Sequence, residues 1–272
     1  MRICIAGKND VAVLCTEYLL NDLEVPKENI IIVPVVNDDG EDGWQRSLKK
    51  YAAQEQLILR SLADVYGMED MVFISLQFDK IIDPSRFVTD KLFNLHFAPL
   101  PKYKGMHTSS WPLINGEEES GVTFHVMDDG IDTGDIIFQE FFEIGINDTA
   151  RDLYEKYKNN GVKLFKDSIG AILSGDFKAR PQPCEFGSYY SKESLSFNDC
   201  KIDFNKTSFE IHNQIRAFIF PGFQLPEICG KNIIKSMLTG DKIEKNTISD
   251  KGNEIHISGV DGYLIKAVIN DD

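Results

Sequence analysis

Four short, largely apolar runs constrain the fold of this chain more than any other feature. They lie at residues 2–7, 29–38, 70–78 and 92–97, and stretches with helical periodicity at 11–20 and 43–56 separate the first three. Strands of this kind, alternating with helices, are typical of a parallel sheet that helices cover on both faces. The sequence therefore predicts a Rossmann-like, doubly wound α/β fold, in which ligands bind at the carboxyl ends of the strands.

The second half of the chain has a different pattern. Two further strands are predicted at residues 121–127 and 135–144, and an amphipathic helix at 149–173. A helical stretch at 208–218 and short apolar runs at 230–238, 253–259 and 262–269 follow, separated by Gly, Asn and Asp. With 272 residues and 42% apolar composition, we expect a large α/β domain at 1–185 and a small β-rich domain at 186–272.

The chain is strongly acidic, with a net charge of −14 and a pI of about 4.8. A surface of this charge repels nucleic-acid phosphates, so we expect no nucleic-acid partner. The five cysteines are odd in number and form no CxxC pair, which indicates reduced thiols and no metal site. There is no signal-peptide cleavage region and no apolar span of about 18 residues. We therefore expect a soluble, cytoplasmic protein without membrane contact.

Two polar side chains interrupt the apolar run at residues 92–97. Side chains alternate along a strand, so Asn94 and His96 face the same way, roughly 6.6 Å apart. Pro99 and Pro101 follow at once, which places both side chains at the carboxyl end of the strand. A histidine there can act as a general base near neutral pH, and an asparagine amide can donate to a developing oxyanion. The alternative is a buried histidine bonded to the backbone, next to an asparagine that closes the strand.

An acidic loop supplies a candidate partner for His96. The stretch VMDDGIDTGDIIFQ, residues 126–139, gathers Asp128, Asp129, Asp132 and Asp135 around two glycines. A carboxylate beside His96 would fix its tautomer and stabilise the imidazolium. The alternatives are a calcium-binding loop or an ordinary turn, although the spacing lacks the glutamate at position twelve of an EF-hand.

Two segments together resemble a known family. FNLHFAPLPKYKG, from residue 93, resembles the Asn-x-His-x-(Ser/Ala)-Leu-Leu-Pro-x-(Tyr/Trp)-(Arg/Lys)-Gly signature of the 10-formyltetrahydrofolate-dependent formyltransferases. GVTFHVMDDGIDTGDIIFQ, from residue 121, resembles their Gly-Val-Thr-x-His-x-Met-Asp-x-x-x-Asp-x-Gly-x-Ile segment. His96 and Asp132 are 36 positions apart, as in this superfamily. The strong part of the resemblance covers residues 71–139.

The resemblance implies a formyltransferase fold and acyl transfer from 10-formyltetrahydrofolate, the co-substrate, to an amine. The family's catalytic trio matches Asn94, His96 and Asp132. In these roles His96 is the general base or proton shuttle, Asn94 stabilises the tetrahedral oxyanion, and Asp132 orients His96 and keeps it basic. The resemblance implies no metal ion.

The stretch ISLQFDKII, residues 74–82, resembles the loop that lines the pterin pocket in this family. The resemblance places Gln77, Phe78 and Ile81 beside the folate, although Phe78 and Ile81 could instead be ordinary core residues. Asp129 is a further candidate for contact with the folate. Gly134 is expected to allow close approach of the backbone.

The family resemblance leaves the accepting amine open. The tail YYSKESLSFNDCKIDFNKTSFEIHNQIRAFIFPGFQ and the segment WQRSLKKYA resemble the nucleotide-sugar N-formyltransferase branch. In that branch the usual acceptor is a dTDP-linked amino sugar, and we expect an amino-dideoxyhexose, with a 3-amino group favoured over a 4-amino group. The resemblance also implies a homodimer and a role in lipopolysaccharide or surface-glycan biosynthesis. The sugar stereochemistry and the nucleotide stay open.

Several residues are candidates for binding this small-molecule nucleotide sugar. A diphosphate needs cations or backbone amides, and a nucleobase needs an aromatic face. The candidates are Lys8, Lys104, Gly105, Arg216, Phe218, Phe220 and Phe223. The phenylalanines could instead pack inside the small domain, and Lys8 could be a solvated loop charge. His107 and His125 lie near the motifs and are interpreted as structural or sugar-contacting.

Three other functions are compatible with the fold. A methionyl-tRNA formyltransferase normally has a larger, positively charged C-terminal domain, whereas the tail here has about 85 residues of mixed charge. A hydrolase that releases formate from the folate usually has an amino-terminal regulatory domain, and we expect none before the strand at residues 2–7. The intact Asn94, His96 and Asp132 disfavour a non-catalytic folate- or nucleotide-binding module.

Overall fold

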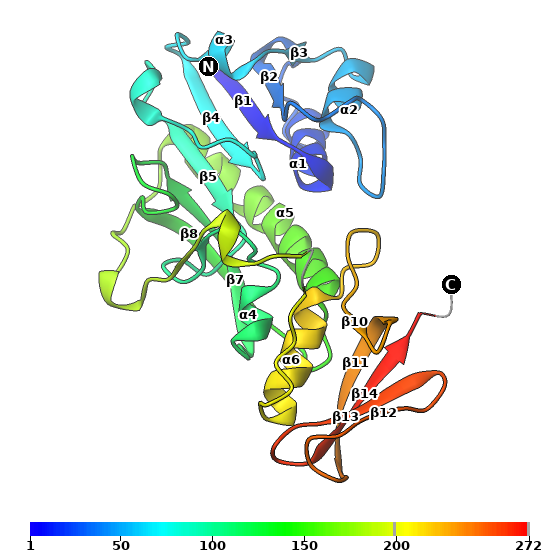
Figure 1. Cartoon of the computed structure of the whole chain (residues 1–272). Coiled ribbons are helices and arrows are strands. Elements are labelled where there is room, and N and C mark those ends of the chain that lie inside the picture. Colours follow the sequence, from blue (N-terminus) through cyan, green and yellow to red (C-terminus); the bar gives the residue numbers. More distant parts are fainter. Residues whose placement is uncertain (198–199, 271–272) are drawn as a thin grey trace. The chain divides into compact units, whose positions relative to one another are not determined.

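The structure is a computed structural model that describes residues 1–197 and 200–270 (Figure 1). The chain divides into two compact units. The first comprises Met1–Lys104, Gly121–Phe141 and Tyr157–Ser188, and the second comprises Gly105–Ser120, Phe142–Lys156 and Tyr189–Asp272. The predicted division into domains at residues 185 and 186 stays a prediction.

A seven-stranded sheet has the strand order β3-β2-β1-β4-β5-β7-β8. Its strands are β1 (Arg2–Gly7), β2 (Ile30–Pro34), β3 (Ile58–Leu59), β4 (Met71–Leu76), β5 (Leu92–His96), β7 (Glu119–Val126) and β8 (Ile136–Glu143). The first five strands pair in parallel, and β7 pairs antiparallel with β5. The predicted α/β fold with a mainly parallel sheet is confirmed.

Helices α1 (Asn9–Asn21), α2 (Leu48–Gln54) and α3 (Leu62–Val65) connect the strands of the first unit. The short helix α4 (Trp111–Ile114) belongs to the second unit, and α5 (Ala150–Ser174) begins in the second unit and continues in the first. The ring of Tyr157 on α5 stacks on that of Phe97, with 5.5 Å between centroids. Gly161, about one turn further along α5, leaves room for that ring, because a Cβ there would lie 3.0 Å from Phe97 Cε1. The helix predicted at 149–173 is confirmed.

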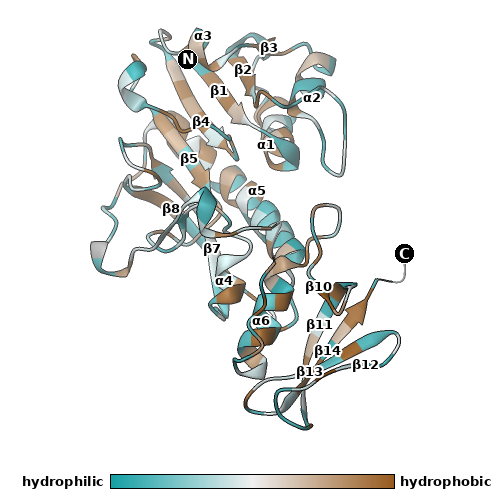
Figure 2. Cartoon of the chain, in the orientation of Figure 1, coloured by the Kyte–Doolittle hydropathy of each residue, from teal (hydrophilic) through white to brown (hydrophobic). Residues whose placement is uncertain are grey.

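The central strands are continuously apolar because both faces of the sheet are buried. All six residues of β4 are buried, as are all residues of β1 except Arg2. Figure 2 shows apolar residues running along β1, β2 and β4. Complete burial of a side chain such as Ile5 or Phe73 stabilises the fold by about 1.5–3 kcal/mol. This burial is the physical reason for the unbroken apolar runs in the sequence.

The order of the parallel strands reverses between β1 and β4. Strands β2 and β3 lie on one side of β1, and β4 and β5 lie on the other, so the carboxyl ends of β1, β4 and β5 share one edge. Gly7 at the end of β1 lies so close to the carbonyl oxygen of Leu76 that a Cβ would overlap it. Open α/β sheets bind their ligands at such a reversal, and His96 lies at the same edge.

A second, antiparallel sheet has the order β10-β11-β14-β13-β12. Its strands are β10 (Glu227–Ile228), β11 (Lys231–Lys242), β12 (Ile248–Asp250), β13 (Glu254–Ser258) and β14 (Tyr263–Ile269). Helix α6 (Ser208–Phe218) packs on it, and Ile211 and Ile215 join the isoleucines of the sheet in one core cluster. A capping box between Thr207 and Glu210 begins α6. The predicted β-rich C-terminal part is confirmed.

The remaining elements are short. Strands β6 (Lys104–Gly105) and β9 (Tyr189–Tyr190) form a two-stranded pair, and four 3₁₀ turns complete the description. These turns are η1 (Lys27–Asn29), η2 (Pro84–Arg86), η3 (Cys184–Phe186) and η4 (Lys192–Ser194).

The helix predicted at residues 43–56 begins later than expected, at Leu48. Its N-cap is Ser47, whose hydroxyl accepts from Lys50 N at 2.9 Å. The preceding residues are held in turns by carboxylates, since Asp42 accepts from Ser47 N and Asp38 accepts from Lys49 N. These side chains compete with helical hydrogen bonds and shorten the helix.

Candidate active site

Asn94 and His96 lie on the same face of β5, as the alternation along a strand predicts. The parallel partner of Asn94 on β4 is Ser75, and its antiparallel partner on β7 is His125. His96 is the last residue of β5 and is 8% exposed. Both side chains therefore stand at the carboxyl end of a central strand, the edge at which open α/β sheets bind their ligands.

The acidic loop between β7 and β8 brings Asp132 to the same place. Asp132 adopts a left-handed backbone conformation, with φ of +54°, that an aspartate tolerates better than most residues. Asp128 closes the turn, because its Oδ1 accepts from Gly130 N at 3.1 Å and from Thr133 Oγ1 at 2.6 Å. Gly134 then passes so close to the carbonyl oxygen of Val126 that no Cβ would fit.

One carboxylate oxygen, Oδ1 of Asp132, lies within reach of three side chains. Nδ2 of Asn94 donates to it at 3.1 Å, Nδ1 of His96 is 3.6 Å away, and Nε2 of His125 is 3.5 Å away. The Asp132 side chain is only 11% exposed. The structure thus brings together the three residues predicted as the catalytic trio, although their catalytic roles stay predictions.

Hydrogen bonds to backbone carbonyls fix which nitrogen of each histidine carries a proton. Nε2 of His96 is 2.8 Å from Tyr103 O, so it must be the protonated nitrogen, and Nδ1 faces Asp132. Nδ1 of His125 donates to Val126 O at 2.8 Å, so its Nε2 accepts from Asn94 Nδ2 at 3.1 Å. A proton that reaches Nδ1 of His96 would be stabilised by the Asp132 carboxylate.

Two further residues belong to this cluster. The sequence predicts a structural or sugar-contacting role for His125, and in the structure this residue accepts a hydrogen bond from Asn94. Gln182 comes from the extended segment after α5 and donates from Nε2 to Asp132 O and Gly134 O, both at 2.8 Å. Its buried Oε1 has no hydrogen-bond partner within residues 1–197 and 200–270. An unsatisfied buried acceptor costs about 1–3 kcal/mol.

Three of the candidate folate-binding residues, Gln77, Phe78 and Ile81, follow the end of β4. The other two, Asp129 and Gly134, lie in the loop after β7. Gln77 has a positive φ of +58° and Phe78 packs against the core cluster of β1, β2 and β4. Ile81 is 79% exposed, so it is no core residue. Asp129 is exposed and Gly134 is buried. Contact of these residues with a folate stays a prediction.

The candidate substrate residues fall into both compact units. Lys8 directly follows β1, is partly buried, and donates from its backbone to Leu76 O at 3.2 Å. Lys104 N donates to Ser188 O at 2.9 Å, which leaves its side chain for other partners. In the second unit, Gly105 has a φ of +85° and lies against the Tyr190 carbonyl, where a Cβ would not fit.

Arg216 on α6 is 2% exposed, which is unusual for an arginine. Its Nε donates to Asn213 Oδ1, and its Nη1 donates to Gly145 O and Asp148 O, at 2.9 to 3.1 Å. Desolvation lowers its pKa to about 10. Most of its donors are therefore spent inside the second unit, and its assignment to substrate stays a prediction.

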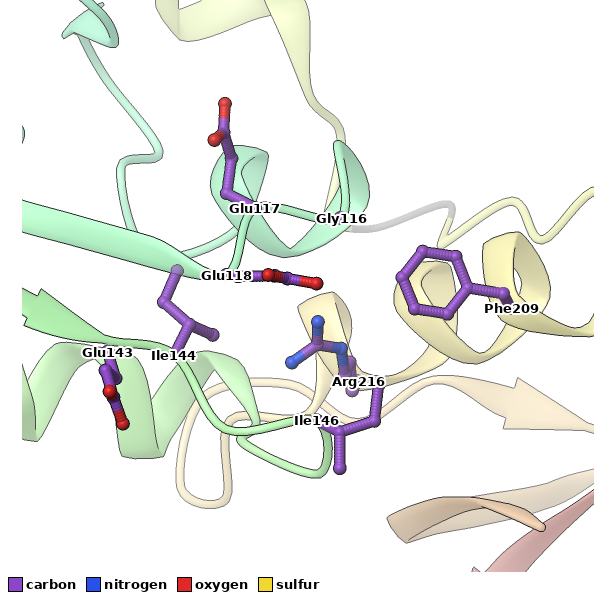
Figure 3. Close-up of a pocket in the computed structure, with 8 residues that line it drawn as sticks. All are labelled: Gly116, Glu117, Glu118, Glu143, Ile144, Ile146, Phe209 and Arg216. Carbon is purple, nitrogen blue, oxygen red and sulfur yellow. The ribbon is translucent and has the colours of Figure 1, made fainter. Parts of the chain in front are cut away.

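The guanidinium of Arg216 borders a cavity of about 330 Å³ in this unit. Figure 3 shows the Glu118 carboxylate turned toward the same space. The other lining residues are Gly116, Glu117, Glu143, Ile144, Ile146 and Phe209.

The three candidate stacking residues differ in exposure. Phe218 and Phe220 are 4% and 8% exposed, whereas Phe223 is 63% exposed. The ring of Phe220 packs edge-on against Phe223 and Tyr154, at 5.2 and 5.8 Å between centroids. A nucleobase needs an accessible ring face, so exposure favours packing roles for Phe218 and Phe220.

Among the described residues, no group of three or more His, Cys, Asp or Glu side chains is arranged to hold a metal ion. Within the same residues, no helix has both the length and the apolar character needed to span a membrane.

The fold and this cluster define an α/β protein with Asn, His and Asp side chains at the carboxyl end of a central strand. The family model described as formyl transferase matches residues 7–169, more than half of the chain. The chain therefore belongs to the formyl transferase family, and the resemblance of its two signature segments is confirmed.

Two solved structures are similar over essentially the full length. The N-formyltransferase from Helicobacter canadensis, in complex with folinic acid and dTDP-3-aminofucose, is 46% identical, with a TM-score of 0.96 and coverage of 99% of this chain and 100% of that one. WlaRD, a sugar 3N-formyl transferase solved with dTDP and 5-N-formyl-THF, is also 46% identical, with a TM-score of 0.97 and coverage of 100% and 98%.

A curated relative is named for a tRNA as its formyl acceptor, whereas a sugar is named for each of the two solved structures. The methionyl-tRNA formyltransferase of Clostridioides difficile is 29% identical, over 99% of this chain and 89% of its own length. Identity to the two sugar enzymes is therefore considerably higher than identity to this tRNA enzyme.

Proposed function

We propose that the protein transfers the formyl group of 10-formyltetrahydrofolate to the amino group of a dTDP-linked amino-dideoxyhexose, with a 3-amino sugar favoured over a 4-amino sugar. The observation that carries this proposal is the full-length match, at 46% identity, to two sugar N-formyltransferases. One of them was solved with dTDP-3-aminofucose, and the other is described as a 3N enzyme.

In the proposed reaction, the neutral sugar amine attacks the formyl carbon of the folate. The new C–N bond gives a tetrahedral intermediate, which collapses as the bond from the formyl carbon to N10 breaks; the amine loses one proton and N10 gains one. His96 takes the amine proton on Nδ1, the nitrogen that the hydrogen bond to Tyr103 O leaves unprotonated. Asp132, 3.6 Å from Nδ1, stabilises the resulting imidazolium. His96 then returns the proton to the leaving nitrogen.

Asn94 is the proposed donor to the oxyanion of the tetrahedral intermediate. Both hydrogens of its Nδ2 are engaged here, one by Asp132 Oδ1 and one by His125 Nε2. Donation to the oxyanion therefore requires Asn94 to release one of these partners when the substrates bind. Apo hydrogen bonds of catalytic groups commonly rearrange in this way.

The two substrates are assigned to different groups of residues. We place the folate against Gln77, Phe78, Ile81, Asp129 and Gly134. For the nucleotide sugar we propose Lys8 and Lys104 as the cations that bind the diphosphate.

A screen with purified protein tests this function. The protein is incubated with 10-formyltetrahydrofolate and a panel of dTDP- and UDP-linked 3-amino and 4-amino sugars, and mass spectrometry detects the gain of one formyl group. We expect the gain with a dTDP-linked 3-amino sugar and a lower kcat/KM for the 4-amino isomer. No gain with any nucleotide sugar, together with formylation of methionyl-tRNA, would overturn the proposal.

Methionyl-tRNA formylation is the second candidate, because the relative from Clostridioides difficile matches 99% of the chain. The acidic composition argues against it, since the net charge is −14 and tRNA binding relies on cations that neutralise phosphates. The same incubation with methionyl-tRNA as the acceptor distinguishes the two.

We further propose that the enzyme acts as a cytoplasmic homodimer in lipopolysaccharide or surface-glycan biosynthesis. Nucleotide sugars are the activated donors for glycan assembly, which supports the pathway class. Light scattering coupled to gel filtration tests the dimer, and a monomeric mass at micromolar concentration would contradict it.

A further inference from the structure

Gln182 stands at the back of the loop that carries Asp132. The residue belongs to the extended segment RPQP, residues 180–183, which carries no strand or helix signal of its own. At the start of this segment, Arg180 and Ile136 exchange two backbone hydrogen bonds, both of 2.9 Å. The segment is thereby fixed beside the first residue of β8, directly after the acidic loop.

The amide of Gln182 closes the gap between this segment and the loop. Nε2 has two hydrogens, and both are spent, one on Asp132 O and one on Gly134 O, each at 2.8 Å. These two carbonyls flank Thr133 in a turn where Asp132 has a φ of +54°. The bonds therefore hold a left-handed conformation that a non-glycine residue adopts at a cost in free energy.

The same geometry leaves a polar atom of Gln182 itself without a hydrogen bond among the described residues. Its Oε1 is buried and has no hydrogen-bond partner in the described part of the chain. A buried acceptor without a donor destabilises the folded state.

We propose that Gln182 is a positioning residue that keeps Asp132 Oδ1 in contact with Asn94 and His96. This inference rests on the proposed function, because the roles of Asn94, His96 and Asp132 do. The backbone of Asp132 is held by Gln182, and its side chain is held by Asn94 Nδ2 at 3.1 Å. If the backbone turn relaxes, the carboxylate moves away from His96, and catalysis declines while the substrates still bind.

The test variant is Gln182→Met, which keeps the size of the side chain and removes both donors. Gln182→Asn is the second variant, because it keeps the amide but is one methylene too short to reach both carbonyls. Arg180→Met is the matched control on the same segment, since the Arg180 side chain donates to Gln139 Oε1 rather than to the loop.

Amide hydrogen exchange gives a readout that does not depend on turnover. Peptides that cover residues 127–135 should exchange about tenfold faster in Gln182→Met and Gln182→Asn than in the wild type. Their exchange rate should be unchanged in Arg180→Met. Unchanged exchange in both Gln182 variants overturns the proposal. This readout stays decisive even if the wild type formylates no nucleotide sugar, an outcome that would defeat the proposed function alone.

Steady-state kinetics distinguish positioning from a general loss of structure. We expect kcat of Gln182→Met to fall about 10- to 100-fold, the factor that two lost hydrogen bonds produce, with the KM for the nucleotide sugar within about threefold. In the Asp132→Asn background the same substitution should lower kcat by less than about threefold, because Gln182 acts through Asp132. A kcat of Gln182→Met within about twofold of the wild type overturns the proposal. So does a double variant whose loss in kcat equals the product of the losses in the two single variants.

Discussion

Asn94 and His125 face each other across β5 and β7, with 3.1 Å between Nδ2 of Asn94 and Nε2 of His125. The hydrogen bond has a defined direction, since Nδ1 of His125 is already protonated toward Val126 O. His125 therefore holds one Asn94 hydrogen while Asp132 holds the other. The orientation of the Asn94 amide follows from two acceptors that lie on different elements, β7 and the loop after it.

Removing Asn94 or His96 should abolish most of the turnover. We expect Asn94→Ala and His96→Ala each to lower kcat by about 100- to 1,000-fold, the range observed when one oxyanion donor is lost. His256→Ala is a suitable control, because this β13 histidine pairs with Glu254 in the antiparallel sheet. Single-turnover assays of formyl transfer measure the effect, and near-normal rates in both catalytic-site variants would refute the proposed roles.

Replacing His125 should weaken catalysis less than replacing Asn94. His125→Phe keeps a ring on β7 but removes the acceptor, so one hydrogen of Asn94 Nδ2 loses its partner. We expect kcat to fall about fivefold, which corresponds to about 1 kcal/mol for one hydrogen bond.

His125→Gln offers an amide oxygen near the position of Nε2 and should recover part of that loss. Equal rates for His125→Phe and the wild type would show that the Asn94 amide needs no second acceptor.

Much of the fold was predictable because the central strands are apolar on both faces. The runs at residues 2–7 and 70–78 correspond to β1 and β4, and the helix at 208–218 corresponds to α6. The two-residue strands β3 and β10 were missed, since so short a segment has no period. The late start of α2 was missed as well, because it depends on Asp38 and Asp42 capping groups that the period does not reveal.

The candidate site was predictable only in part. Strand alternation placed Asn94 and His96 on one face, and the family resemblance added Asp132. The role of His125 depends on its register opposite Asn94, which no local pattern specifies. Gln182 reaches Asp132 from 50 positions away in a segment without periodicity. Arg216 is a candidate for the substrate diphosphate by its charge, and the sequence does not reveal that the carbonyl groups of Gly145 and Asp148 accept its hydrogens inside the second unit.

The cysteines should differ sharply in reactivity. Burial raises the pKa of the Cys4 and Cys15 thiols well above the usual range, and both are 0% exposed, whereas Cys229 is exposed. Because the thiolate is the reactive form, we expect alkylation of Cys229 in the native protein and of Cys4 and Cys15 only after unfolding. Peptide mass spectrometry after a timed pulse of iodoacetamide measures this order. Early labelling of Cys4 or Cys15 would be incompatible with the buried positions of these residues.

His212 should make the stability of the protein depend on pH. This residue of α6 is 0% exposed, with Nε2 2.7 Å from Ile146 O and Nδ1 2.8 Å from Ser236 Oγ. Desolvation, and to a lesser extent the nearby Arg216 charge, lower its pKa from 6.5 to about 4. Between these two values the unfolded chain binds a proton that the folded chain does not. The contribution of His212 to the free energy of unfolding is therefore fully present above pH 6.5. It is lost as the pH decreases, and the loss is about 2 kcal/mol at pH 5.

Urea unfolding of the wild type and of His212→Gln, at pH 7.5 and at pH 5, tests this dependence. The glutamine cannot take up a proton, so His212→Gln should lack the part of the acid-induced loss that His212 causes. The variant is expected to be less stable than the wild type at pH 7.5, since it does not reproduce both hydrogen bonds, and the difference should shrink at pH 5. The control His256→Gln should keep the wild-type decrease. An equal decrease in the wild type and His212→Gln would show that His212 is already protonated in the folded protein at pH 5.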